Sequence, residues 1–282
     1  MKSFDERVAV ITGGAGTFGR ALAARFVQAG MRIVLADRDQ TALDAAVAEL
    51  HKAGAQAIGV ATDVSSAESM EALARRTIDA FGAVHLVANN AGVAPLGNAW
   101  ESSVADWQWT LGVNLWGVIH GVRTFTPIML AQGTEGHILN TASVAGLISP
   151  PGMAAYNVSK HAVVALTETL HHDLARERAK IRCSVICPAY FPSGISASER
   201  SRPRELTNQT PPTAHQLALQ TVLAKAVSSG RISAPDIANL AFEAVREERF
   251  YVLSHPKIRG AIQARMEDLL AGANPRDPLA LQ

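Results

Sequence analysis

The chain has 282 residues, of which 48% are hydrophobic and 18% are charged, and its formal net charge is +1. Such a chain can bury a large core, and its near-neutral charge gives no reason to expect a nucleic-acid partner. No apolar run reaches the ~20 residues that cross a bilayer, and no signal-peptide core follows Met1. We therefore expect a cytoplasmic protein without a membrane partner.

Short apolar runs alternate with helical patterns along the whole chain. The predicted strands are residues 7–12, 31–36, 55–61, 84–88, 136–142, 181–187 and 250–253. The predicted helices are residues 13–30, 40–53, 66–81, 104–132, 161–178 with its start near Tyr156, 215–228 and 255–270. This alternation predicts βαβ units, and therefore an α/β fold with a parallel sheet that helices cover on both faces.

No repeat or low-complexity linker divides the sequence, so we predict one domain over residues 1–282. Within it, residues 189–232 break the βαβ rhythm and form an insertion after the sixth strand. Ligands of open α/β sheets bind outside the carboxyl ends of the strands, so we expect this insertion to select the substrate. Residues 255–282 form a C-terminal helix and a tail, and we expect the tail to fray.

The first connection is rich in glycine, because Gly13-Gly14-Ala15-Gly16-Thr17-Phe18-Gly19 joins the first strand to the first helix. Such a turn lets backbone N–H groups approach a pyrophosphate at the positive end of a helix, although any tight turn also uses glycine. Asp37 ends the second strand, 24 residues after Gly13. A carboxylate there can bind an adenosine ribose, so the two features together predict a dinucleotide site.

A second pattern places Tyr156 four residues before Lys160, with Ser143 upstream at the end of a predicted strand. Residues at i and i+4 share a helix face, and a cation near a phenol favours the phenolate over the neutral form, whose free pKa is near ~10. The pair is suited to general acid/base work, with Ser143 orienting a substrate oxygen. Alone, a Tyr-x-x-x-Lys helix is commonplace and usually holds a packed tyrosine and a solvated lysine.

Several motifs in one order resemble those of the short-chain dehydrogenase/reductase family. They are Thr12-Gly13 with Gly19, Asn89-Asn90-Ala91-Gly92, Asn114, Ser143, Tyr156 and Lys160. The resemblance covers about residues 5–195 and implies a single Rossmann-type, doubly wound domain with a seven-stranded parallel sheet. It also implies a homodimer or homotetramer. Residues 112–129, and residues 193–195 with 201–203, are in addition similar to bacterial benzylic-alcohol dehydrogenases of lignin-ether breakdown.

The resemblance implies roles for single residues. Tyr156 would be the catalytic acid/base, Lys160 would bind the nicotinamide ribose and lower the tyrosine pKa, Ser143 would steady the substrate oxygen, and Asn114 would hold a helix kink and a water. The expected cofactor-binding residues are Gly13, Gly16, Thr17, Phe18, Gly19, Asp37, Arg38, Asp63, Val64, Asn90, Ala91, Gly92, Tyr156, Lys160, Pro188 and Ser193. No Cys or His cluster has zinc spacing, so no metal is expected.

Two positions depart from the family pattern. Thr17 stands where the family has the second glycine of its phosphate turn, and a β-branched residue restricts the backbone, so we expect a shifted turn. After the sixth strand, the family commonly has Pro-Gly and then a threonine that touches the carboxamide. This chain has Pro188-Ala189 instead, and we assign the missing hydroxyl to Ser193.

Asp37 puts a negative charge where NADP carries its extra phosphate, so we expect NAD(H) in preference to NADP(H). Arg38 is the counter-argument, because a guanidinium can bind that phosphate. With no charged residue clearly aimed at the pocket, we expect an uncharged, hydrophobic secondary alcohol or its ketone, held against Tyr190 and Phe191. We expect Arg200, Arg202 and Arg204 to form a solvated loop.

Two alternative functions remain open at this point. One is an NADPH-dependent 3-oxoacyl-type ketoreductase, which needs basic residues near the adenosine ribose. The other is a non-catalytic dinucleotide sensor, which has no need for Asn114, Ser143, Tyr156 and Lys160 together.

Overall fold

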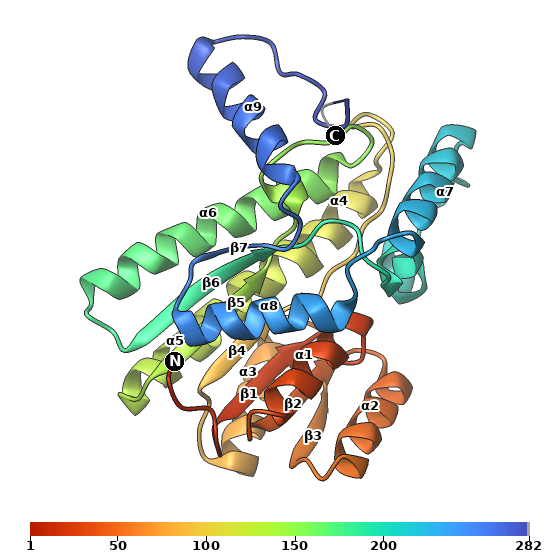
Figure 1. Cartoon of the computed structure of the whole chain (residues 1–282). Helices are drawn as coiled ribbons and strands as arrows, with labels where there is room; N and C mark the ends of the chain where they lie inside the picture. Colours follow the sequence, from red (N-terminus) through yellow and green to blue (C-terminus); the bar gives the residue numbers. More distant parts are fainter. Residues whose placement is uncertain (281–282) are drawn as a thin grey trace.

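Seven parallel strands form one sheet in the order β3-β2-β1-β4-β5-β6-β7 in the computed structural model, which describes residues 1–280. The strands are β1 Val8–Thr12, β2 Arg32–Asp37, β3 Ala57–Ala61, β4 Leu86–Asn89, β5 Gly136–Thr141, β6 Ile181–Cys187 and β7 Tyr251–Leu253. The strand order reverses direction at β1, with β2 and β3 on one side and β4 to β7 on the other (Figure 1). The predicted fold, a single doubly wound domain with seven parallel strands, is confirmed.

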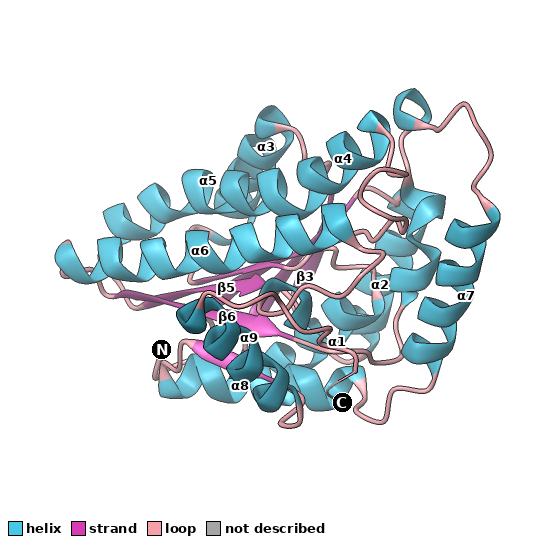
Figure 2. Cartoon of the chain, turned by 90° about the horizontal axis from the view of Figure 1, so that it is seen from above, coloured by secondary structure: helices cyan, strands magenta, loops and turns pink. Residues whose placement is uncertain are grey.

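Helices cover both faces of this sheet (Figure 2). They are α1 Thr17–Val27, α2 Gln40–Lys52, α3 Ala67–Phe81, α4 Val104–Leu111, α5 Gly117–Gln132, α6 Ala154–Arg176, α7 Ala214–Ser228, α8 Ala234–Glu247 and α9 Ile258–Ala271. Helices α3 to α6 lie on one face, and α1 and α8 pack together on the other (Figure 2). Within residues 1–280, no helix has the combined length and hydrophobicity needed to cross a membrane.

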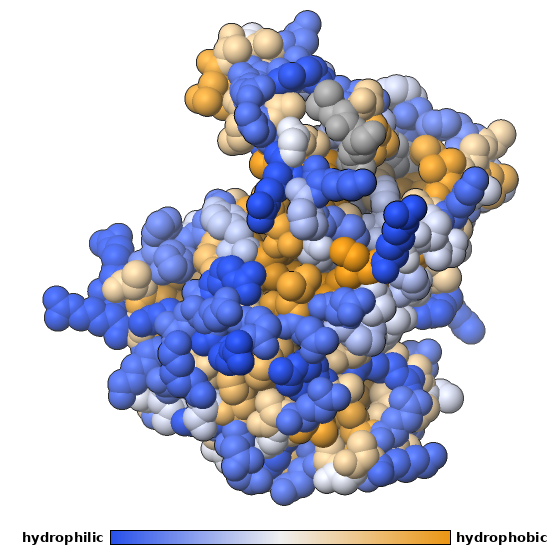
Figure 3. All heavy atoms as spheres, in the orientation of Figure 1, coloured by the Kyte–Doolittle hydropathy of each residue, from blue (hydrophilic) through white to orange (hydrophobic). Residues whose placement is uncertain are grey.

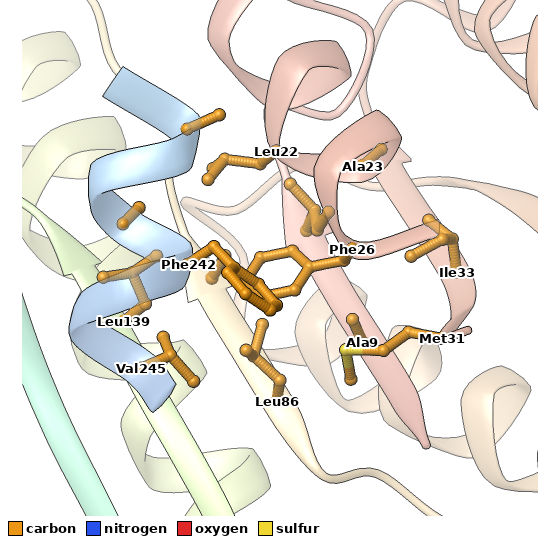
Figure 4. Close-up of a cluster of buried hydrophobic side chains, with 14 of the residues drawn as sticks. Ala9, Leu22, Ala23, Phe26, Met31, Ile33, Leu86, Leu139, Phe242 and Val245 are labelled. Carbon is orange, nitrogen blue, oxygen red and sulfur yellow. The ribbon is translucent and has the colours of Figure 1, made fainter. Parts of the chain in front are cut away.

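The strands are buried along their whole length where helices cover both faces, and their side chains alternate between the two layers. In β1, Ala9 and Ile11 pack with α1 and α8, whereas Val8 and Val10 pack with the opposite layer. Phe26 of α1 and Phe242 of α8 meet with ring centroids 5.9 Å apart (Figure 4). Removing such a buried ring costs about 3–5 kcal/mol, so this pair fixes α8 on the sheet.

Helix α8 is absent from the elements that the sequence predicts, although its start carries a clear signal. Ser233 and Asp236 form a capping box, in which each side chain accepts a hydrogen bond from the other residue's backbone N–H, and Pro235 lies in the first turn. The predicted continuous helix 104–132 is interrupted by a π-helical turn at Gly112–Trp116. The remaining predicted elements differ from the observed ones by a few residues at their ends.

The predicted tail follows the end of α9. Gly272 ends the helix with a φ of 63°, and residues 273–280 then run back along it. Residues 281–282 of the predicted tail lie outside the described residues.

Candidate active site

A cavity of about 1020 Å³ lies at the carboxyl ends of the strands. Its walls include the residues that directly follow β1, β3, β4, β5 and β6, which is where an open α/β sheet binds ligands. Every residue expected to bind the cofactor lines it: Gly13, Gly16, Thr17, Phe18, Gly19, Asp37, Arg38, Asp63, Val64, Asn90, Ala91, Gly92, Tyr156, Lys160, Pro188 and Ser193.

The glycine-rich turn forms one end of this cavity. Gly13 has a φ of 62°, and a Cβ on Gly19 would overlap the carbonyl oxygen of Gly13. Thr17 is simply the first residue of α1, so the shifted turn expected from its β-branched side chain is not needed. No side chain within residues 1–280 caps α1, and its first N–H groups remain available for an anion. The turn therefore fits a pyrophosphate.

The second strand places a carboxylate beside this turn. One oxygen of Asp37 accepts a hydrogen bond from the Ala15 N–H at 3.1 Å, and the other accepts one from the Asp39 N–H at 3.2 Å. These bonds fix the carboxylate at the cavity wall. Arg38 also lines the cavity, but its guanidinium donates to the Ser201 carbonyl at 3.0 Å. Arg38, which follows Asp37 in the chain, thus already has a partner in the insertion.

Thr12 positions the turn after β4 and was missed as a site residue, although the Thr-Gly pair was part of the motif. Its hydroxyl oxygen accepts hydrogen bonds from the N–H groups of Asn90 at 2.9 Å and Ala91 at 3.2 Å. The Asn90 side chain donates back to the Thr12 carbonyl at 3.0 Å. This reciprocal set joins the ends of β1 and β4 where the two strands meet the cavity.

Asn114 is fully buried behind the cavity and does not line it. It lies in the π-helical turn, which accounts for the kink expected there. Its amide oxygen accepts from the Val93 N–H at 2.8 Å, and its amide nitrogen donates to the Val93 carbonyl at 2.9 Å and the Ser159 hydroxyl at 3.1 Å. Ser159 in turn donates to the Tyr156 carbonyl at 2.7 Å, so Asn114 is connected to the tyrosine backbone.

Tyr156, Lys160 and Ser143 converge on the cavity from α6 and the end of β5. The Lys160 ammonium lies 5.6 Å from the centroid of the tyrosine ring and donates to the Thr141 carbonyl at 2.8 Å. The Ser143 hydroxyl donates to the Pro188 carbonyl at 3.3 Å and accepts from the Ala145 N–H at 3.2 Å. Helix α6 and two neighbouring strand ends therefore hold the three groups together.

Burial governs the protonation of these groups. It raises the pKa of Tyr156 to about 12, against an opposing effect from its hydrogen bond with Ser143. Burial also lowers the pKa of Lys160 to about 8. In the protein alone, the ammonium therefore does not produce the lowered phenol pKa that the Tyr-x-x-x-Lys spacing suggests.

The opposite part of the cavity is mainly apolar. Its walls there include Ile148, Met153, Tyr190, Ile195, Leu223 and Val227. Phe191 is directed away from this part, because its ring packs edge-on against Phe18 at 5.7 Å. The cations Arg200, Arg202, Arg231 and Lys257 also line the cavity, so charged side chains border a pocket at which none was expected to be clearly aimed. Arg200, Arg231 and Lys257 are exposed, whereas Arg202 is buried in ion pairs.

Arg202 corrects the expectation of a solvated arginine loop. Its side chain is only 6% exposed and forms ion pairs of 2.7 Å with both Asp106 and Glu199. Its guanidinium lies 4.1 Å from the centroid of the Trp109 ring. The arginine thereby attaches the insertion to α4, an association that no local sequence pattern encodes.

The model of the family described as "short chain dehydrogenase" matches residues 7–204. The chain belongs to the short chain dehydrogenase family. Its resemblance to this family is thus confirmed, and with it a place among the oxidoreductases. All of the residues expected to act in catalysis lie within the matched segment.

Individual family members are similar over nearly the whole chain. A short chain dehydrogenase/reductase from Burkholderia phymatum, whose crystal structure is a complex with NAD, is 53% identical with a TM-score of 0.97 and 99% coverage of both chains. A CLA biosynthesis dehydrogenase/reductase of Lactiplantibacillus plantarum is 33% identical over 98% of this chain and 97% of its own. A C alpha-dehydrogenase of Sphingobium sp. is 31% identical over 98% and 90%, in agreement with the weaker likeness to benzylic-alcohol dehydrogenases.

Proposed function

We propose that the chain interconverts a hydrophobic secondary alcohol and its ketone with NAD(H), and that Tyr156 is the acid/base. The observation that carries this proposal is that Tyr156, Ser143 and Lys160 converge on the same cavity as the uncapped glycine turn and Asp37. A cavity of about 1020 Å³ exceeds the usual range for a single small ligand, so it has room for a dinucleotide and a substrate together.

In this mechanism, the glycine turn, Asp37 and Lys160 would hold the dinucleotide, whose oxidised nicotinamide would supply the hydride acceptor. Tyr156 takes the proton of the substrate hydroxyl, and Ser143 orients the substrate oxygen by a hydrogen bond. Lys160 is held by the Thr141 carbonyl one turn from the phenol, where its ammonium would bind the nicotinamide ribose and favour the phenolate against the effect of burial. Asn114 acts by holding the backbone around Tyr156.

The preference for NAD over NADP is supported by two contacts. The fixed Asp37 carboxylate would repel a 2′-phosphate, and Arg38 is engaged with the Ser201 carbonyl at 3.0 Å. The Burkholderia phymatum relative is in complex with NAD. Titrating both oxidised cofactors against tryptophan fluorescence tests this part, and tighter binding of NADP would contradict it.

Substrate choice is assigned to the insertion, residues 189–232, whose Tyr190, Ile195, Leu223 and Val227 supply an apolar wall.

A homodimer or homotetramer is proposed as the working form. In its support, Trp100, Val104 and Trp116 are 84%, 73% and 50% exposed, and such apolar surface is typical of a contact with a second chain. Light scattering on the purified protein measures the assembly directly.

The central test is Tyr156→Phe. We expect kcat to fall by roughly 10²-fold or more, the size of a lost acid/base contribution, while NAD binding is retained. Tyr190→Phe is the matched control, because Tyr190 lines the same cavity and has no assigned proton-transfer role. Candidate substrates are aryl, alicyclic, polyol and acyl-thioester alcohols, and the oxidation of each is measured by the absorbance of NADH. Near-normal turnover of Tyr156→Phe would reject the mechanism.

A further inference from the structure

The end of the chain reaches the cavity from outside the βαβ framework. Residues 272–280, which we call the C-terminal strap, run back from the end of α9 toward the body of the molecule (Figure 1). Leu279 of the strap lines the cavity. This contact is distant in sequence from every residue that the glycine turn or the Tyr-x-x-x-Lys pattern identifies.

The strap is held in place by a clamp centred on Arg276. Its guanidinium donates to Asp268 at 2.8 Å, to the Ala264 carbonyl at 2.8 Å and to Glu267 at 3.2 Å. Its backbone N–H donates to the second oxygen of Asp268 at 3.0 Å. A chain end is poorly ordered unless it is tied down. The two hydrogen bonds from Arg276 to Asp268 therefore fix the path of the residues that follow Arg276 in the chain.

A short turn then presents Leu279 to the cavity. The Asp277 side chain accepts from the Leu279 N–H at 2.9 Å, and the Asp277 carbonyl accepts from the Ala280 N–H at 3.2 Å. Leu279 is 45% exposed, whereas Leu270 at the end of α9 is 84% exposed and does not line the cavity. Apolar side chains gather in the hollow beneath α9 on the face shown in Figure 3.

Helix α9 connects this strap to the substrate side of the cavity. Ile258 and Ala261 of α9 pack against Ile148. Val144, the residue that follows Ser143 in the chain, packs against the same cluster. Ile148, Val144 and Ile258 all line the cavity. The strap is therefore anchored on the helix that borders the substrate-orienting serine, and not on the glycine turn.

We propose that the C-terminal strap closes the substrate side of the cavity, and that Leu279 sets how long a substrate can be. This proposal rests on the proposed function, because a substrate must lie between Ser143 and the strap. A larger side chain at position 279 shortens the space available, and a smaller one lengthens it. Because the strap lies away from the glycine turn, NAD affinity stays unchanged.

The kinetic test compares two secondary aryl alcohols, 1-phenylethanol and the longer 1-(biphenyl-4-yl)ethanol. In Leu279→Trp, we expect kcat/KM for the biphenyl alcohol to fall by about 10-fold relative to that for phenylethanol, as one clashing group does in a hydrophobic pocket. Leu279→Ala should raise the ratio of kcat/KM for the biphenyl alcohol to kcat/KM for phenylethanol. Leu270→Ala is the matched control and should leave this ratio unchanged. An unchanged ratio in Leu279→Trp would overturn the proposal.

A second measurement needs no turnover, so it separates this proposal from the proposed function. Cys183 and Cys187 are both buried, so a new thiol can be followed with an aromatic disulfide reagent. We expect the thiol of Leu279→Cys to react about 5-fold more slowly than that of Leu270→Cys, because thiol reactivity follows exposure. Adding Arg276→Ala should remove the difference. Equal rates with the clamp intact would refute the strap even if neither alcohol is oxidised.

Discussion

The two ends of the cavity are built by different means. The end that fits a dinucleotide is shaped by residues next to strand ends, because the Gly13 turn and the α1 N–H groups are backbone and the Thr12 and Asn90 side chains bond to backbone atoms of the neighbouring strand end. The substrate end is shaped by side chains from distant segments. Arg202 reaches Asp106 at 2.7 Å, and the Ser198 hydroxyl accepts from the Ala94 N–H at 3.1 Å.

This difference predicts how each end responds to substitution. A backbone-built site leaves no room for a side chain, so a single methyl group in the glycine turn is severe. A site built by long-range contacts can move as a unit when one contact is lost. Substitutions there should therefore change substrate affinity more than cofactor affinity, and the two ends can be separated experimentally.

The largest effect on ligand affinity is expected at the dinucleotide end, from Gly19→Ala. Its Cβ would overlap the Gly13 carbonyl, so the turn must open. We expect NAD affinity to fall by roughly 10²-fold, or about 2.7 kcal/mol, in a fluorescence titration. Gly260→Ala in α9 is the matched control, because nothing lies within 4 Å of a Cβ there. It should bind NAD normally, and a normal affinity in Gly19→Ala would contradict a backbone-built site.

At the substrate end, the corresponding change is Arg202→Met. The substitution leaves the Asp106 carboxylate buried without its cation. Breaking a buried ion pair in this way lowers the stability of the folded state by about 3 kcal/mol. The loss should fall on the docking of residues 194–206, so KM for the alcohol rises while the dissociation constant of NAD changes much less. Arg204→Met, at an exposed position of the same insertion that does not line the cavity, is the control. Equal losses of alcohol and NAD affinity would show that the ends are not independent.

The same division explains what the sequence could predict. The strands, the glycine turn, Asp37 and the Tyr156 to Lys160 spacing depend on local periodicity or on neighbours within one turn, so their placement on the cavity followed from the chain itself. Arg202 and Leu279 were not predicted. Their positions depend on partners about 100 residues away or on a chain reversal at Gly272. Local composition carries no information on such contacts.

Two other results show where local reasoning stops. The spacing of Lys160 suggested a lowered phenol pKa, yet burial, which depends on the whole fold, raises the pKa of Tyr156 to about 12. Helix α8 had a readable capping box at Ser233, but it lies next to an irregular segment without βαβ rhythm. Its identity as a core helix depends on Phe242 meeting Phe26, a contact between opposite ends of the chain.

The smallest expected effect on ligand binding concerns the sheet that both ends share. His137 in β5 donates to the Ser184 hydroxyl at 2.8 Å, because Ser184 itself donates to the Arg249 carbonyl at 2.6 Å. The other ring nitrogen of His137 is buried and has no partner within residues 1–280. His85, beside β4, accepts from the Val8 N–H at 3.1 Å. Both rings are thus held in their neutral form.

Burial lowers the pKa of His137 to about 3 and that of His85 to about 4. The unfolded chain, with histidine pKa values near 6.5, therefore binds more protons, so stability is full above pH 6.5 and is lost as the pH falls toward these folded values. At pH 5, His137 should lower the free energy of unfolding by about 2 kcal/mol, and the more solvent-screened His85 should lower it by less. Urea unfolding at pH 7.5 and 5.0 measures this, and His137→Gln should remove more than half of the difference. His172→Gln, at an exposed position of α6, should leave the difference intact. Since the sheet supports both ends, the acid-induced loss should weaken NAD and alcohol binding together, unlike either substitution above.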